Sequence, residues 1–237
     1  MAPFTDPVQL PRPEQRRWRP TPTQVASWVH PGVRRVASTI DRRQAEWDAH
    51  NTDQQHAAGP LWVALGDSSV VGVGASSIDR TATMVVYRHL LAVDRQPWRL
   101  INLGRYGAKL DEVTRTQLTR LYDWGPPTLV TVGAGANDVA WSFGTASTQD
   151  AFGRLLDGLP LGAVVGTVPA GWFGKGLRIN DWLRQQARDR DLRVAEAGVL
   201  PHWRSQVAAD GFHPNDDGYR FIAEGVLAAL GIDAPTG

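Results

Sequence analysis

The sequence predicts a three-layer α/β fold in which a five-stranded parallel sheet lies between helices. From residue 60 onward, short apolar runs that suit buried strands alternate with longer segments whose apolar residues recur at helical spacing. Parallel strands joined by helices need right-handed crossovers, which put helices on both faces of the sheet. Five such strands favour the flavodoxin-like order 2-1-3-4-5, whose switch point lies between the first and third strands.

The individual elements follow from the spacing of apolar and turn residues along the chain. The first strand is expected at 61–65 and ends at a Gly-Asp-Ser turn. The other strands are expected at 98–103, 128–132, 161–168 and 192–195. The helices that connect and follow them are expected at 81–93, 111–122, 149–156, 175–189 and 216–230. All strand carboxyl ends then meet at one edge of the sheet, where open α/β folds carry their functional groups.

The N-terminal part differs in composition, and we expect residues 1–58 to form an extension before a main domain of residues 59–237. Residues 1–22 are rich in proline and arginine and offer little to bury, which predicts an extended or disordered segment. Apolar residues at helical spacing predict an amphipathic helix over 33–49, and the polar run 51–59 indicates a linker. We expect the helix to pack on the outside of its own domain; covering the functional site or forming a homo-oligomer are the alternatives.

Composition excludes several functional classes. The net charge of +1 gives no global field that would attract nucleic acid or an anionic membrane. The absence of cysteine excludes disulfides, thiol catalysis and thiolate metal sites. No run approaches the roughly 18 apolar residues that span a bilayer, and the first twenty residues lack the apolar core of a signal peptide. We therefore expect a cytoplasmic protein.

Three loops that carry polar groups are expected to meet beside the first strand. Ser68 follows that strand directly, where a nucleophile could be presented. Small residues after the third strand lead to Asn137, whose side-chain amide is a donor, and the loop after the second strand offers the main-chain N–H of Gly107. Each loop alone also fits an ordinary turn, because Ser, Asn and Gly are common turn residues.

A fourth loop, Asp210-Gly211-Phe212-His213-Pro214, brings a carboxylate and a histidine together before the last helix. Three residues apart in a turn, Asp210 can accept a hydrogen bond from the ring N–H of His213, which fixes the tautomer and leaves the other ring nitrogen free as a base. The alternative is a plain capped loop at the start of the helix. His202 is a second candidate base, but no carboxylate lies a few residues from it.

Together these four blocks resemble the SGNH (GDSL) hydrolase family of esterases and lipases over roughly residues 60–232. The matching blocks, in the family's order, are Gly66-Asp67-Ser68 followed by Gly72 and Gly74, then Asn102–Gly107, Gly135–Asp138 and Asp210–Pro214. Each block is short, but their joint order and their placement after strands are specific. The resemblance implies the SGNH hydrolase fold, with no cofactor and no metal.

The resemblance also implies a role for each matched residue. Ser68 is expected to be the nucleophile, His213 the base and Asp210 its orienting acid. The oxyanion hole is expected to consist of the main-chain N–H groups of Ser68 and Gly107 and the side chain of Asn137. The chain departs from the family at Arg105 and Tyr106, where smaller residues are common, so bulk is expected near the pocket.

The expected function is hydrolysis of a carboxylic ester with a short or medium acyl chain, so that the partner is a small-molecule ester. The same residues would also support acyl transfer or the deacetylation of a carbohydrate, and a non-catalytic binding protein is a further alternative. Four aromatic residues at the carboxyl edge of the sheet are candidates for the acyl pocket, or else for core packing: Trp141, Phe143, Trp172 and Phe173.

Overall fold

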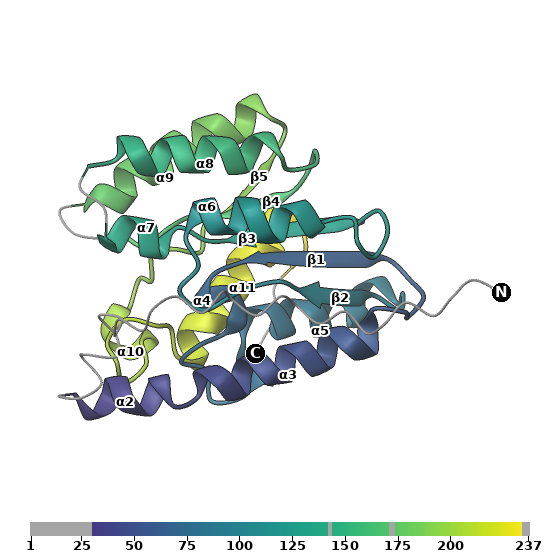
Figure 1. Ribbon diagram of the computed structural model, residues 1–237, viewed down its shortest axis with the longest axis horizontal. Helices are drawn as coiled ribbons and strands as arrows, with labels where there is room; N and C mark the ends of the chain where they lie inside the picture. The colour runs from purple at the N-terminus through teal and green to yellow at the C-terminus, as the bar shows by residue number, and fades with distance from the viewer. Residues whose placement is uncertain (1–29, 142–143, 171–173, 234–237) are drawn as a thin grey trace.

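The strands form a parallel sheet in the order β2-β1-β3-β4-β5, which confirms the predicted fold class and strand order (Figure 1). The computed structural model describes residues 30–141, 144–170 and 174–233. The strand bounds are β1 Leu61–Gly66, β2 Arg99–Asn102, β3 Leu129–Gly133, β4 Val164–Gly166 and β5 Arg193–Ala195. In this register Val63 of β1 lies opposite Ile101 of β2 and Val130 of β3, so β1 is the buried central strand next to the switch point.

Most of the predicted elements of the main domain are present, with shifted ends. The helices α9 Lys175–Asp189 and α11 Asp216–Leu230 have the predicted bounds, and α5 Ala82–Asp94 is shifted by one residue. The helix α8 Ala146–Asp157 is longer than predicted, whereas β2 and β4 are shorter. Four short helical segments lie in regions that the apolar pattern left as loops: α4 Ser68–Val71, Ile78–Arg80, α7 Ala136–Trp141 and α10 Trp203–Gln206.

The predicted helix at 111–122 is irregular. It begins as α6 Leu110–Glu112, widens to a π-helix over Val113–Gln117 and ends as a 3₁₀ turn over Leu118–Arg120. Short π-helical segments are uncommon and often occur at functional sites. Here the widened turn contains Gln117, a buried polar residue whose side chain reaches β1.

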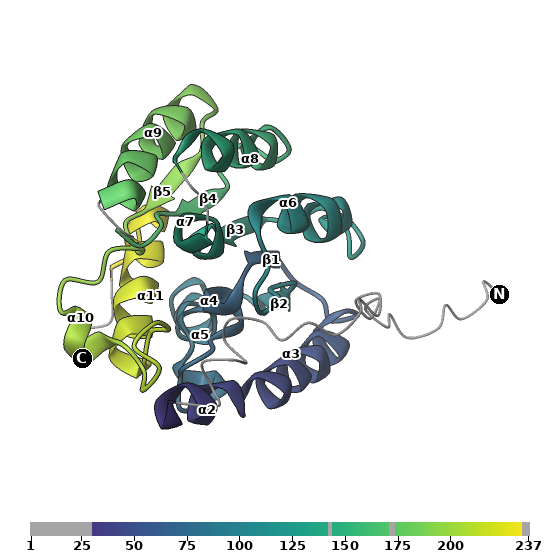
Figure 2. The ribbon, with the colours of Figure 1, turned by 60° about the vertical axis from the view of Figure 1, so that its left-hand side comes forward.

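Side chains alternate between the two faces of the sheet, so each face has its own core. On β1, Val63 and Leu65 belong to one core, which α8 and α9 cover with residues such as Phe152 and Leu183. Trp62 of the same strand belongs to the other core, which is built from α3, α5 and α11. Figure 2 shows these helices in two layers with the sheet between them.

The N-terminal segment forms two helices, α2 Pro31–Ala37 and α3 Ile40–Gln54, where we predicted one helix over 33–49. The break has a local cause: the hydroxyl groups of Ser38 and Thr39 donate to the carbonyls of Arg35 and Val36 and so compete with helical hydrogen bonding. The predicted linker was wrong at its start, because α3 continues to Gln54.

The helix α3 packs on β2 and α4, and its Trp47 is 1% exposed. The predicted extended segment 1–22 lies outside the described residues. Within the described part of the chain, no helix combines the length and the apolar character that a membrane span requires.

Candidate active site

Ser68 lies in a tight turn at the carboxyl end of β1, which we call the Ser68 turn (residues 66–76). Asp67 begins α4: its Oδ1 accepts from the Ser69 N–H at 2.9 Å and from the Ser69 hydroxyl at 2.8 Å. Gly72 ends this helix at φ +82°, where a Cβ would lie 2.0 Å from a methyl carbon of Thr81. Only glycine fits there, so the sequence itself forces the chain to turn six residues after the end of β1.

The start of the Ser68 turn is held from the opposite face of the sheet. Gln117, from the π-helical segment, accepts from the Gly66 N–H at 2.7 Å and donates to the Gly66 carbonyl at 2.9 Å. One buried side chain thereby satisfies both main-chain polar groups of Gly66, which lies two positions before Ser68. This role is hard to predict from sequence, because a single glutamine within a helix normally faces solvent.

Ser68, His213 and Asp210 are joined by hydrogen bonds. His213 Nε2 lies 3.0 Å from Ser68 Oγ, and its Nδ1 lies 2.6 Å from Asp210 Oδ2. The other carboxylate oxygen accepts from the N–H groups of Phe212 and His213 at 3.0 Å each. This arrangement orients the imidazole so that Nε2 faces the serine hydroxyl.

Electrostatics favour a charged Asp210. Burial raises the pKa of this carboxyl group, but the hydrogen bond and charge of His213, with the two main-chain N–H groups, outweigh burial and lower the pKa below its ordinary value. A carboxylate that stays ionised can stabilise a positive charge on the neighbouring ring when that ring takes up a proton.

The loop with His213 is anchored at both ends. Before it, Val207 forms an isolated antiparallel bridge with Pro214, and the Ala208 N–H donates to the His213 carbonyl at 2.8 Å. After it, Asn215 caps α11 by accepting from two main-chain N–H groups. The ring of Phe212 packs edge-on against His213 at 5.0 Å, which leaves the imidazole buried at 6% exposure.

Asn137, in the first turn of α7, and Gly107, in the loop after β2, follow the two strands that flank β1, and the structure brings them together. The Asn137 amide donates to the carbonyl of Ala108, the neighbour of Gly107, at 3.0 Å. An amide carries two N–H donors, so a second N–H exists for another acceptor. Gly107 has φ +75° and open space where a Cβ would lie, so its main chain is accessible.

The two bulky residues of this loop point to different neighbours. The Tyr106 ring lies 6.0 Å from the His213 ring, as expected from bulk near the site. Arg105 instead forms an ion pair with Asp48 of α3 at 3.5 Å. The other candidate base, His202, is exposed and lies at the start of α10.

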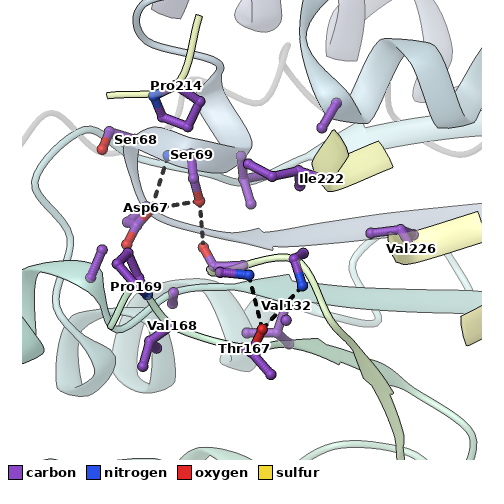
Figure 3. Close-up of a pocket in the computed structure, with 18 of the residues that line it drawn as sticks. Asp67, Ser68, Ser69, Val132, Thr167, Val168, Pro169, Pro214, Ile222 and Val226 are labelled. Atoms are coloured by element: carbon purple, nitrogen blue, oxygen red, sulfur yellow. Dashed lines mark hydrogen bonds between the residues drawn. The ribbon is translucent and has the colours of Figure 1, made fainter. Parts of the chain in front are cut away.

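Behind the Ser68 turn lies an apolar cavity of about 140 Å³. Figure 3 shows the Ser69 side chain on the cavity side of the turn, whereas the Ser68 hydroxyl points away from its centre. Ile222 and Val226 of α11 line the far end. Two threonines in its wall already have partners: Thr131 accepts from the Trp62 indole N–H, and Thr167 accepts from two main-chain N–H groups.

Asp67 also lines the cavity, and it differs from the two threonines in keeping an unpaired polar atom. It is 1% exposed, and its Oδ2 has no hydrogen-bond partner among the described residues. Burial raises the pKa of Asp67, and the hydrogen bonds from Ser69 only partly oppose this. Burial therefore disfavours the charged form of this carboxyl group beside the cavity.

The structure offers other pocket residues than those we predicted. The side chains of Trp141, Phe143, Trp172 and Phe173 lie outside the described residues. Two other aromatic residues, Trp203 and Phe212, line the cavity, and they are 43% and 41% exposed. Phe212 could have been found from its place inside the Asp210–Pro214 block, whereas Trp203 carried no signal beyond its proximity to His202. Among the described residues, no group of three or more His, Cys, Asp or Glu gathers as metal ligands would.

Comparison with known proteins identifies the family. The family model of GDSL-like lipases and acylhydrolases matches residues 64–221, more than half of the chain. The chain belongs to the GDSL-like lipase/acylhydrolase family. All four sequence blocks lie within the matched range. No curated protein matches the sequence.

Solved structures with the same fold are distant in sequence. A lipase from a goat rumen metagenome aligns with a TM-score of 0.58 at 15% identity and covers 72% of this chain and 97% of its own. An acetyl xylan esterase from Geobacillus stearothermophilus aligns with a TM-score of 0.58 at 16% identity and covers 77% and 100%. An alpha/beta hydrolase from the metagenome of Lake Arreo, Spain, aligns with a TM-score of 0.57 at 20% identity and covers 75% and 98%. This member of the GDSL-like family therefore has the fold of the SGNH hydrolases.

Proposed function

We propose that this protein is a serine esterase that hydrolyses carboxylic esters through an acyl-enzyme intermediate. The observation that carries the proposal is the hydrogen-bonded chain from Ser68 Oγ through His213 to Asp210. A serine hydroxyl is a weak nucleophile at neutral pH and needs a positioned base. His213 Nε2 is at hydrogen-bond distance from that hydroxyl, as a general base must be.

In the proposed acylation, His213 takes the Ser68 proton as Oγ attacks the ester carbonyl carbon. The tetrahedral intermediate carries a negative oxygen, which accepts hydrogen bonds from the Ser68 and Gly107 main-chain N–H groups and from the Asn137 amide. His213 then protonates the leaving alcohol, the C–O bond breaks, and the acyl group stays on Ser68.

Deacylation repeats these steps with water. His213 takes a proton from a water molecule that attacks the acyl carbonyl carbon, and it returns the proton to Ser68 Oγ as the carboxylic acid leaves. Asp210 stabilises the imidazolium in both half-reactions without becoming protonated, which fits its lowered pKa.

The acyl chain of the proposed substrate is short or medium, and the cavity behind the Ser68 turn receives it. Ser68 and His213 line the cavity at its active-site end, and Trp203 and Phe212 stand at its exposed rim. Its apolar walls favour a hydrocarbon chain, and its volume of about 140 Å³ sets an upper limit on length unless the walls move. Val226, at the far end, is the residue expected to stop a longer chain.

The test is hydrolysis of nitrophenyl esters of increasing acyl length, with Ser68→Ala as the control. A maximum at short or medium length that disappears in the variant supports the proposal. Equal rates in both proteins, or no hydrolysis of any ester by a folded wild-type protein, would reject it. Added alcohol separates acyl transfer from hydrolysis, because a transferase would release a new ester in place of the free acid.

A further inference from the structure

One face of α3 carries three polar donors that reach the active-site loops. Arg43, Trp47 and Asn51 are four residues apart and therefore share a helix face. We call these three residues the α3 row. Arg43 and Trp47 are each 1% exposed, so a charged group and an indole N–H are both buried at this contact.

Two members of the α3 row bind the Ser68 turn. The Trp47 indole N–H donates to the Val71 carbonyl at 2.8 Å, and the Arg43 guanidinium donates to the Ala75 carbonyl at 3.0 Å. Between them, the Val73 carbonyl accepts from the Tyr219 hydroxyl at 2.7 Å. Buried side chains thus donate hydrogen bonds to three alternate carbonyls of the turn. Loss of such a donor would leave a buried carbonyl unpaired, which lowers stability.

The part of the turn that Arg43 holds lies directly behind His213. A Cβ on Gly74 would lie 2.4 Å from the Pro214 carbonyl and 3.1 Å from His213 Cβ, so the two backbones are in close contact. A shift of residues 73–75 would therefore move the histidine loop relative to Ser68.

The third member, Asn51, binds the loop on the other side of Ser68. Its amide donates to the Asn102 carbonyl, and its oxygen accepts from the Asn102 N–H, both at 2.8 Å. The Asn102 side chain then donates to the Val70 carbonyl at 3.0 Å and accepts from the Gly104 N–H at 2.9 Å. Asn51 is thereby linked to α4, which begins at Ser68, and to the loop that leads to Gly107.

All three residues precede residue 64, where the match to the family model begins. We propose that Arg43, Trp47 and Asn51 are positioning residues for catalysis, because they fix the Ser68 turn relative to the His213 and Gly107 loops. This inference rests on the proposed ester hydrolysis. Its physical basis is that displacements of about 1 Å at reacting groups cost on the order of 100-fold in rate.

Arg43 gives the sharpest test, because the chain contains a matched control. Arg43→Met keeps much of the side-chain volume but removes the donor, whereas Arg43→Lys keeps a donor for the Ala75 carbonyl. Arg42→Met changes the neighbouring arginine, which is 60% exposed and pairs only weakly with Glu46 at 3.8 Å. The measurements are kcat and KM for a short nitrophenyl ester, with active sites counted by the acylation burst, well below the lowest melting temperature.

We expect kcat per active site to fall about 10-fold or more in Arg43→Met, with KM within about twofold. Arg43→Lys should recover most of the loss, and Arg42→Met should equal wild type. A folded Arg43→Met protein with wild-type kcat per site would overturn the proposal. So would a loss confined to the number of active sites, because that would indicate a role in stability alone.

Two further measurements keep the test decisive. If Arg43→Met does not fold, Trp47→Phe replaces it: this variant keeps an aromatic ring, loses the indole N–H, and is judged by the same criteria. If wild type hydrolyses no ester, the proposed function fails, and the labelling rate of Ser68 by a fluorophosphonate then decides the positioning role. Slower labelling in the folded variant than in wild type and Arg42→Met supports that role; equal labelling rejects it.

Discussion

The two sides of the Ser68 turn are built in opposite ways. On the side of the hydroxyl, His213 and Asp210 form a short chain of hydrogen bonds, and both carboxylate oxygens of Asp210 have partners. On the other side is an apolar cavity of about 140 Å³, and Asp67 keeps one unpaired oxygen beside it. Proton transfer needs fixed geometry, whereas a hydrocarbon chain needs only space without competing polar groups. Under the proposed function, the chemistry takes place on one side and the acyl chain is selected on the other.

The largest effect should come from the polar side. Ser68→Ala removes the proposed nucleophile, and we expect ester hydrolysis to fall by about 10³-fold or more. The melting temperature should change little, because only a hydroxyl group is lost. Rates on a nitrophenyl ester together with a thermal melt check both statements. A variant that retains most of its activity would remove Ser68 from the mechanism.

The next largest effect should come from the proposed oxyanion donors. Asn137→Ala removes one donor, and we expect kcat to fall by about 10²–10³-fold. The same change breaks the hydrogen bond to the Ala108 carbonyl, which contributes about 1 kcal/mol to stability. Kinetics and a denaturant melt separate the two contributions. If activity falls only in proportion to the folded fraction, Asn137 acts through the loop structure alone.

The apolar side should change selectivity rather than rate. Val226→Phe fills the far end of the cavity, and we expect the preferred acyl chain to become shorter, with about 10-fold lower kcat/KM for the longest chain accepted by wild type. The shortest ester should react at nearly the wild-type rate. Val93→Phe is the matched control, because Val93 is 56% exposed on α5. Equal losses for all chain lengths would mean that the acyl chain binds elsewhere.

The two sides also differ in how well the sequence predicted them. The polar side follows from short blocks: Gly72 forces the turn after Ser68, and Asp210 is close enough along the chain to orient His213. Strand order then brings the separate blocks to one edge of the sheet. Local residue chemistry and topology were sufficient to predict which residues lie together there, whereas their catalytic roles stay predictions.

The apolar side and the supporting contacts could not be predicted in the same way. The cavity is the space left between α5, α11 and the sheet, so it depends on the packing of the entire layer. Gln117 depends on a π-helical widening that no apolar pattern encodes. Asn51 lies in a polar stretch that indicates a linker, and its partner Asn102 is 51 residues away. Contacts of this kind are made to main-chain N–H and carbonyl groups. Because every residue carries these groups, the residue types do not reveal which ones a side chain will bind.

The smallest expected effect concerns Asp67, the polar exception on the apolar side. Its pKa is raised in the folded protein by burial, so the folded state holds a proton more tightly than the unfolded chain. The stability that this proton contributes is fully present below the unfolded pKa of about 3.9 and is lost as the pH rises through the folded value. Asp67→Asn cannot ionise and keeps an oxygen for the Ser69 N–H. We therefore expect the melting temperature of Asp67→Asn, relative to wild type, to rise by about 2–4 °C between pH 4 and pH 8.

Asp150→Asn, at an exposed position, is the control for the general effect of removing a carboxyl group. The measurement is a set of thermal melts of the three proteins at both pH values. If the difference between Asp67→Asn and wild type is the same at pH 4 and pH 8, Asp67 does not hold its proton in the folded state. The unpaired oxygen would then be charged and would need a partner, such as a bound water or a polar group of the substrate. In that case the charged Asp67 oxygen makes one side of the cavity polar. The cavity should then prefer acyl chains that carry a hydrogen-bond donor over plain hydrocarbon chains.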